Sequence, residues 1–500
     1  MIRDLFDEER LPPPLDEYLR STNPWWKSKP APVIPPYHRW VFRTVLKKLS
    51  SGLAPVLLLR GPRQVGKTTL QLQIIEHLIQ SLKVDPRRIL RVQFDEIPSL
   101  TGLPEPILTI ARWFENHILC QTFNETARQN APAFLFLDEV QNLSDWAPQL
   151  KGLVDHHTVK VLVTGSSALR ISAGRDSLAG RITSMDLGTF LLREIIAMRF
   201  GEEIQPHLPE NGLEPLLRVD FWRSLQSLGV ASCFIRNKGF AEFSHRGGYP
   251  MAQAHPDVPW PEIADQLNET VIQRAIQHDL RMGKKGAKRD QQLLEEVYRL
   301  ACRYAGQCPS QAIFVQEIKQ ALNANIGWTR ILTYLRFLDG ALLLKMVPPL
   351  ELRLKRRKGN SKICLCDHGL RASWLQEVIP LDEEGLHHSP HLGDLAGHIA
   401  ESVTGYFLGT IPHLDLAHFP ERGVEPEVDF VLTIGEHRIP LEVKYRQHID
   451  VHRDTVGLRA FIERRVYNAP FGILVTLHDD VQIPDPRIVG VSLSSLLLLR

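Results

Sequence analysis

The sequence has few cysteines, no long apolar run and almost no net charge, and each shortage excludes a class of protein. Six cysteines scattered over 500 residues do not make a disulfide framework, which favours a reducing cytoplasm. Apolar runs such as residues 134–137 are far shorter than the roughly 20 residues that span a membrane. The first twenty residues lack the apolar core of a secretory signal. We therefore expect a cytoplasmic protein with no membrane partner.

The charge balance does not by itself indicate a nucleic-acid partner. The formal net charge is +2, from 59 Lys and Arg against 57 Asp and Glu, so any basic surface must be local. Apolar residues make up 43% and charged residues 23% of the chain, which is typical of globular proteins. A chain of 500 residues exceeds one ordinary core, and we expect about two or three domains.

The chain divides into five segments that differ in composition and in the spacing of their apolar residues. Residues 1–36 form a proline-rich N-terminal arm, which we expect to lie extended on the next domain because proline fixes φ and removes a donor. Residues 37–200 alternate short apolar runs with helical spacing, which predicts an α/β fold: a parallel sheet with helices on both faces. Residues 201–285 are a helical and irregular connection. Residues 286–385 read as three helices and a hairpin, which suggests a winged helix, and residues 386–500 read as helix, three strands, helix and strand.

A glycine-rich loop of the form G-x-x-x-x-G-K-T follows an apolar run and opens a helix. Its residues are Gly61, Pro62, Arg63, Gln64, Val65, Gly66, Lys67, Thr68 and then Thr69. Backbone N–H groups in such a loop converge on phosphate oxygens, and the helix adds its positive N-terminal end. Lys67 would reach the β- and γ-phosphates, and the Thr68 hydroxyl would hold Mg²⁺. Because both flanks fit, we expect Mg-ATP here rather than a chance match.

Two carboxylates follow the apolar run of residues 134–137. Asp138 would complete the Mg²⁺ shell, and Glu139 would orient and deprotonate the attacking water. The carboxyl end of a parallel strand is where ligands bind in such sheets. An apolar run that ends in two acids is a weak signal by itself. Together with the upstream loop it predicts a hydrolytic site.

Two further residues are candidates for the same site. Ser166 follows the next apolar run, where a hydroxyl would contact the γ-phosphate or the lytic water; the alternative is a simple polar turn. Arg181 lies where a neighbouring subunit's site would receive it, and an arginine supplied in trans stabilises charge on the γ-phosphoryl group. The alternative for Arg181 is an ordinary surface or ion-paired residue. The trans role implies a homo-oligomer, for example a ring.

These pieces resemble the AAA+-type P-loop ATPases of bacteria and archaea that carry a C-terminal restriction-endonuclease-like domain of unknown function. The resemblance rests on LLLRGPRQVGKTTL, FLFLDEVQNLSDW, VLVTGSSALRIS and SLAGRI, and extends to RGGYP near residue 248 and KICLCDHGL near residue 366. It covers most of the chain. It implies a nucleoside-triphosphatase core that works as an oligomer. The resemblance indicates the fold of the chain more than its cellular function.

The C-terminal segment contains a second candidate site. Residues 427–432 and 438–444 alternate apolar and polar residues, which predicts a hairpin with Asp429, Glu442 and Lys444 on one side of its sheet. This D…E-x-K pattern resembles the PD-(D/E)XK nuclease fold. In that fold, acids hold Mg²⁺ and a lysine positions or activates water at the phosphodiester.

Glu401, on an amphipathic helix at residues 395–408, matches the helical acid of the same fold. The metal set would then be Glu401, Asp429 and Glu442, holding a second Mg²⁺ or a Mn²⁺. The alternative is an ordinary charged outer face of a hairpin, or a nuclease fold that only binds DNA.

A dense basic run lies beside the expected wing. It consists of Arg353, Lys355, Arg356, Arg357 and Lys358. Such a wing would sit on DNA phosphates; the alternative is a solvated loop. Three hypotheses follow: an ATP-driven DNA-processing protein, a nucleotide-controlled DNA-binding or signalling switch with an inert nuclease fold, and an ATPase that remodels protein partners.

Overall fold

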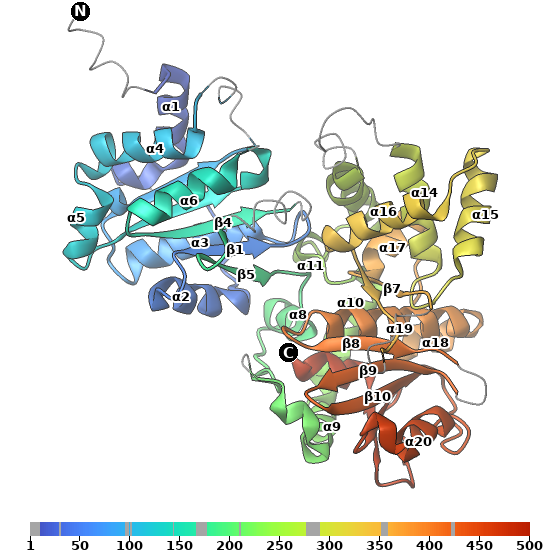
Figure 1. Ribbon diagram of the computed structural model, residues 1–500. Helices are drawn as coiled ribbons and strands as arrows, with labels where there is room; N and C mark the ends of the chain where they lie inside the picture. Colours follow the sequence, from blue (N-terminus) through green and yellow to red (C-terminus); the bar gives the residue numbers. More distant parts are fainter. Residues whose placement is uncertain are drawn as a thin grey trace, which may run out of the picture. The chain divides into compact units, whose positions relative to one another are not determined.

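The chain divides into two compact units, Met1–Leu187 and Gly188–Arg500, which are described one at a time (Figure 1). The computed structural model describes residues 11–29, 32–95, 100, 103–143, 145–166, 178–209, 212–276, 291–351, 359–421 and 426–500. Over these ranges, every helix is too short or too polar to cross a membrane.

The first unit is built on a sheet of five parallel strands in the order β2-β3-β4-β1-β5. The strands are β1 (Val56–Arg60), β2 (Ile89–Gln93), β3 (Ala133–Asp138), β4 (Val159–Gly165) and β5 (Ile182–Asp186). Strands β1 to β4 are almost entirely buried, which explains their near-continuous apolar sequences. The predicted parallel sheet is confirmed.

Helices cover this sheet. They are α2 (Val41–Ser51), α3 (Lys67–Gln80), α4 (Pro106–Phe114), α5 (Phe123–Arg128) and α6 (Trp146–His156). One apolar cluster joins alternate residues of the strands, such as Leu58 and Val161, to Ile110 of α4 and Leu150 of α6. Figure 1 shows α4 and α6 on one side of the sheet and α2 on the other.

The N-terminal arm is not extended as the proline content predicts. Pro13–Thr22 forms the helix α1, and Pro24–Lys27 forms a 3-10 turn. Over residues 13–27 the prediction is wrong, because Pro13, Pro14 and Pro24 stand in the first turn of their elements. There the missing N–H costs nothing and the fixed φ suits a helix.

The arm covers the edge of the first sheet through side chains that bond the backbone of β2. The amide of Asn23 donates to the carbonyl of Arg91 at 2.9 Å and accepts the Arg91 N–H at 2.7 Å. The indole N–H groups of Trp25 and Trp26 donate to the carbonyl of Ile89 at 3.1 and 2.8 Å. An edge strand that would otherwise pair with another chain is thereby closed.

The second unit begins with helices. They are α8 (Leu192–Phe200), α9 (Val219–Ala231), α10 (Cys233–Arg246), α11 (Pro250–Ala254), α12 (Trp260–Leu267), α14 (Gln291–Arg303), α15 (Gln311–Leu322) and α16 (Trp328–Gly340). The antiparallel strands β6 (Leu344–Val347) and β7 (Lys362–Leu365) follow, then α17 (His368–Leu375) and α18 (Glu383–His388). Three helices and a hairpin are therefore present where the sequence places them. That they form a winged-helix domain stays a prediction, as do the five segment boundaries.

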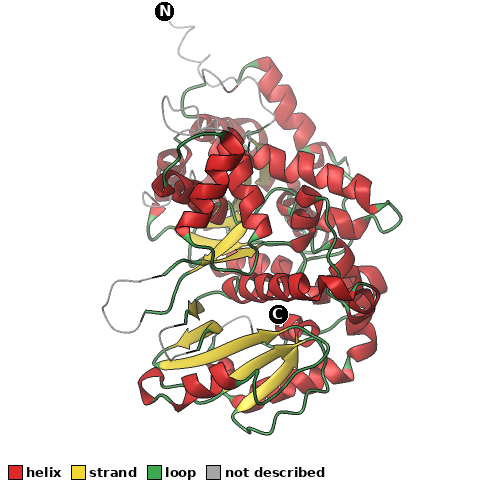
Figure 2. Ribbon diagram, turned by 90° about the vertical axis from the view of Figure 1, so that its right-hand side faces the viewer, coloured by secondary structure: helices red, strands yellow, loops and turns green. Residues whose placement is uncertain are grey.

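The last part of the second unit is a mixed sheet with the strand order β12-β11-β10-β9-β8 (Figure 2). Its elements are α19 (Gly393–Gly409), β8 (Asp415–Phe419), β9 (Val428–Ile434), β10 (His437–Lys444), α20 (Val456–Glu463), β11 (Gly472–Thr476), β12 (Ile488–Ser492) and α21 (Leu493–Leu496). Strands β8, β9 and β10 are antiparallel, and β10, β11 and β12 are parallel. The predicted order of helix, three strands, helix and strand is present from α19 to β11, and a further strand, β12, and the short helix α21 follow it.

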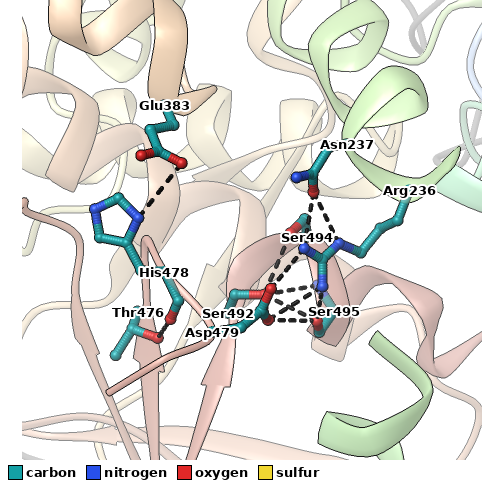
Figure 3. A network of polar contacts seen from close by, with 9 residues as sticks. All are labelled: Arg236, Asn237, Glu383, Thr476, His478, Asp479, Ser492, Ser494 and Ser495. Atoms are coloured by element: carbon teal, nitrogen blue, oxygen red, sulfur yellow. Dashed lines mark hydrogen bonds and ion pairs between the residues drawn. The ribbon is translucent and has the colours of Figure 1, made fainter. Parts of the chain in front are cut away.

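A buried polar network fastens α10 to the end of this sheet (Figure 3). Arg236, which is 2% exposed, donates to both carboxylate oxygens of Asp479 at 3.1 and 2.6 Å and to Ser495 at 2.6 Å. The hydroxyl of Ser492 also donates to Asp479, at 2.5 Å. Burial acts against ionisation, yet Arg236 and the hydroxyls hold the pKa of Asp479 below its usual value.

Candidate nucleotide site and a second acidic site

The glycine-rich loop turns sharply between β1 and α3. An added Cβ at Gly61 would lie 2.3 Å from the carbonyl oxygen of Leu187, so only glycine fits that position. Gln64 and Gly66 have φ angles of 62° and 90°. Such left-handed turns aim successive backbone groups at one point, which is how these loops bind anions.

Lys67 is the first residue of α3, and its ammonium lies inside the curve of the loop. It is 5% exposed and donates to the carbonyl oxygens of Gly61 at 3.0 Å and Pro62 at 2.8 Å. Its Nζ atom also lies 3.7 Å from Oε1 of Glu139. The loop and the predicted acid therefore meet at the carboxyl edge of the sheet.

Thr68 and Asp138 are also brought together. The Thr68 hydroxyl donates to Oδ2 of Asp138 at 2.8 Å, and Asp138 is fully buried at the end of β3. A hydroxyl and a carboxylate are the oxygen ligands that Mg²⁺ prefers. These two residues fit the magnesium position of a bound Mg-ATP.

Two residues that the sequence reasoning missed support Asp138. Arg91 of β2 donates to its Oδ2 atom at 3.2 Å, and the Thr164 hydroxyl of β4 donates to its Oδ1 atom. Arg91 is 6% exposed, and its charge within an apolar strand was the signal that could have found it. Together they fix which way the carboxylate faces.

Glu139 is held as an ionised carboxylate next to Ser166. The Ser166 hydroxyl donates to Oε2 of Glu139 at 2.9 Å, and the Gln141 amide donates to the same oxygen. Burial acts against ionisation, but Lys67 and Arg63 hold the pKa of Glu139 below its usual value. An ionised carboxylate can accept a hydrogen bond from a water and orient it. Ser166 thus contacts Glu139, and its contact with the γ-phosphate or the lytic water stays a prediction.

Arg181 directly precedes β5, at the amino end of the parallel strands, whereas the nucleotide site lies at their carboxyl end. Its guanidinium pairs with Asp155, with Nη2 3.1 Å from Oδ2, and its carbonyl accepts the Val56 N–H at 3.1 Å. Val56 is the first residue of β1, and the glycine-rich loop follows Arg60 at the other end of this strand. The two ends of β1 are four residues, or about 13 Å, apart. Arg181 therefore does not serve its own chain's site, and its role in trans stays a prediction.

The second site brings together Glu401, Asp429, Glu442 and Lys444. Oδ2 of Asp429 accepts the Val443 N–H at 2.9 Å, and the Asp429 N–H donates to Glu442 at 3.4 Å. Lys444 donates to Oε1 of Glu442 at 2.6 Å. Asp429 and Glu442 are each 7% exposed, so they are not a solvated outer face of a hairpin.

A fifth residue, Lys362 of β7, lies within this cluster. It is 2% exposed, and its Nζ atom is 2.8 Å from Oε2 of Glu401 and 2.7 Å from Oδ1 of Asp429. Burial acts against its charge, yet the two acids hold the pKa of Lys362 well above its usual value. Burial and the Asp429 charge raise the pKa of Glu401 and of Glu442 to about 8. The sequence reasoning missed Lys362, although a lysine that opens an apolar strand was a signal.

The basic run of Arg353, Lys355, Arg356, Arg357 and Lys358 lies outside the described residues. It stands between β6 and β7 in the sequence. Its contact with DNA stays a prediction.

The strand order, the loop around Lys67 and the acids at the end of β3 fit a P-loop nucleotide-binding fold. In agreement, residues 54–196 match the AAA domain family, whose members are generally ATPases that use ATP and Mg²⁺. Residues 237–379 match a domain of unknown function (DUF8612). Neither match extends to residues 386–500.

A relative is similar to about half of this chain. An uncharacterized protein of Methanocaldococcus jannaschii is 24% identical over 254 residues, which are 51% of this chain and 49% of the relative. The chain thus spans about half the length of this curated relative. The comparisons support a nucleotide-binding ATPase of the AAA type.

Proposed function

We propose that this protein is an AAA-type ATPase that couples ATP hydrolysis to the processing of DNA. The observation that carries the DNA half is the convergence of Glu401, Asp429 and Glu442 with Lys444 in one cluster, in which Asp429 and Glu442 are buried. An acidic cluster with an adjacent lysine suits a metal ion at a phosphodiester.

In the nucleotide half, Lys67 would bind the β- and γ-phosphates, and Thr68 and Asp138 would hold Mg²⁺. Glu139, ionised and bonded by Ser166, would orient the attacking water. Arg181 of one subunit would complete the site of another, which requires a homo-oligomer. Its surface ion pair with Asp155 leaves it near the outside of the unit.

In the DNA half, the elements α19, β8, β9, β10, α20 and β11 would form an endonuclease-like domain, and their order supports this proposal. Glu401, Asp429 and Glu442 would hold Mg²⁺ or Mn²⁺, and Lys444 would position a water. The helices α14, α15 and α16 with the hairpin β6-β7 would form a winged helix, whose basic run would contact phosphates.

A second candidate function is a nucleotide-controlled DNA-binding or signalling switch with an inert nuclease fold. Lys362 is the observation that favours it, because its ammonium lies between Glu401 and Asp429. A buried cation there neutralises the acids that a metal ion would need. In this candidate the cluster is a structural ion pair and the DNA is bound without being cut.

One experiment separates the two candidates. Supercoiled, linear and branched DNA would be incubated with the full chain and Mg²⁺ or Mn²⁺, and binding and cleavage would be measured separately. Cleavage that survives Lys67→Ala and disappears in Asp429→Asn supports the nuclease. Asp415→Asn is the matched control, because Asp415 is exposed at the start of β8. Binding without cleavage supports the switch, and the absence of binding contradicts both.

A further inference from the structure

Three side chains of different chemistry meet beside the acidic cluster. Cys308 lies between α14 and α15, His418 lies in β8, and Glu427 directly precedes β9. One potential ligand atom of each, a thiol sulfur, a ring nitrogen and a carboxylate oxygen, lies within 4.8 Å of the others. Sulfur and nitrogen together with one carboxylate form a ligand set that suits Zn²⁺ better than Mg²⁺ or Ca²⁺.

The backbone holds Cys308 in place. The Gly306 N–H donates to the carbonyl of Ile363 at 2.7 Å, and the Ile363 N–H donates to the carbonyl of Gln307 at 3.0 Å. The segment that leads to Cys308 is therefore paired with β7. Cys308 is half-buried, so a metal ion can still reach its sulfur atom.

His418 is oriented as a metal ligand is. It is 1% exposed, and its Nε2 atom lies 2.8 Å from the carbonyl oxygen of Asn360, to which it can only donate. That bond leaves the lone pair on Nδ1, which lies 3.7 Å from Sγ of Cys308. Ligating histidines commonly donate their other ring N–H to a carbonyl in this way.

The distance between the sulfur and the nitrogen matches a shared metal ion. With zinc–sulfur and zinc–nitrogen bonds of about 2.3 and 2.0 Å and a tetrahedral angle, the two ligand atoms are about 3.6 Å apart. The observed separation is 3.7 Å, and the same sulfur lies 3.9 Å from Nε2. Because the sulfur lies almost as close to Nε2, the Cys308 side chain must rotate toward Nδ1 to share an ion with it.

We propose that Cys308, His418 and Glu427 bind one Zn²⁺ ion, with a water molecule as the fourth ligand. Binding replaces the Cys308 S–H bond by a sulfur–zinc bond, and the proton passes to solvent. The ion would fasten the segment between α14 and α15 to β8 and to the start of β9. This site lies beside the acidic cluster but uses other residues, and the proposal does not depend on whether the protein cuts DNA.

Cobalt(II) tests the site, because a thiolate ligand gives Co²⁺ an intense near-ultraviolet charge-transfer band that oxygen ligands do not give. The metal-free full chain is titrated with Co²⁺ and then with Zn²⁺. We expect one equivalent of the band, its loss on adding Zn²⁺, and its absence in Cys308→Ser. Cys233→Ser is the matched control, because Cys233 is exposed on α10, and it should keep the band.

A second variant covers the case in which Cys308→Ser does not fold. Glu427→Gln changes an exposed side chain, so the fold should survive, and the Zn²⁺ affinity should fall by about tenfold or more with the band retained. The proposal is overturned if the wild type shows no band, if Cys308→Ser keeps it, or if Glu427→Gln binds Zn²⁺ as tightly as the wild type.

Discussion

The Nζ atom of Lys362 lies 2.7 Å from Oδ1 of Asp429, and both side chains are buried. The same ammonium lies 2.8 Å from Oε2 of Glu401, so one lysine joins β7 to β9 and α19. A cation therefore already stands between two of the three acids that would hold a metal ion. Metal binding at this cluster must compete with Lys362.

Lys362→Met should tighten Mn²⁺ binding at the acidic cluster. Without the ammonium, two buried carboxylates lose their partner, and the free energy of unfolding in a chelator should fall by about 3 kcal/mol. Mn²⁺ should restore part of that loss, with an affinity at least tenfold above the wild type, or about 1.4 kcal/mol. Calorimetric titration of the nucleotide-free chain measures the affinity.

Lys444→Met is the control for that variant. Lys444 is 31% exposed and contacts Glu442 rather than the pair of acids at Lys362, so its loss should destabilise the fold less. Equal Mn²⁺ affinities in the wild type and in Lys362→Met would show that the lysine does not compete with a metal ion.

Glu139→Gln should bind ATP but hydrolyse it slowly. The amide keeps the size of the side chain and loses the charge that orients the water, so the rate should fall by about 10² to 10⁴. Nucleotide binding, followed with a fluorescent ATP analogue, should stay near the wild-type value. Glu105→Gln serves as control, since Glu105 is exposed and makes no contribution to the proposed chemistry. A rate that equals the wild type would exclude Glu139 from catalysis.

Arg181→Ala should lower ATP hydrolysis by about 10³ or more if Arg181 acts in trans. Mixing Arg181→Ala with Lys67→Ala chains should then restore part of the activity, because each mixed pair contains one complete site. Asp155→Asn breaks the same surface ion pair and leaves the arginine in place, so it should stay active. If confirmed mixed oligomers regain nothing, Arg181 is only an ion-paired surface residue.

The stability of the second unit should depend on pH through Asp479. Its pKa is held below the usual value of 3.8, so its contribution is complete above pH 3.8 and is lost as the pH falls through the lower folded value. Asp479→Asn should lower the free energy of unfolding at pH 7 by about 2 to 3 kcal/mol, because buried Arg236 loses its charged partner.

Denaturant unfolding at several pH values measures this effect. The difference between the wild type and Asp479→Asn should shrink on acidification below pH 4. Asp485→Asn should change the stability much less, because its partner Arg487 is 43% exposed whereas Arg236 is 3% exposed. A difference that stays constant down to pH 2 would rule out the Asp479 ion pair as its source.

The nucleotide site was predictable because its determinants are local. Gly61, Lys67 and Thr68 lie in one loop, and a parallel sheet brings strand ends such as Asp138 to one edge. Arg91 and Thr164 escaped prediction because they act through Asp138 from two other strands. Their contribution depends on the strand order, which periodicity alone does not give.

The acidic cluster was predictable only in part. Alternation along β9 and β10 places Asp429, Glu442 and Lys444 on one side, as the structure shows. Lys362 comes from β7, far earlier in the sequence, and no spacing rule connects it to Asp429. The prediction of an extended N-terminal arm was wrong over residues 13–27 for a different reason. Proline disfavours the interior of a helix but suits its first turn.

We propose that the nucleotide site serves work on DNA, and the ATPase rate of the full chain with and without DNA tests this proposal. Mg²⁺-dependent hydrolysis would be measured alone and with single-stranded, duplex and branched DNA, with Lys67→Ala as the inactive control. We predict that at least one DNA stimulates the wild-type rate and that Lys67→Ala stays inactive with all of them. A wild-type rate that no DNA changes would contradict the account.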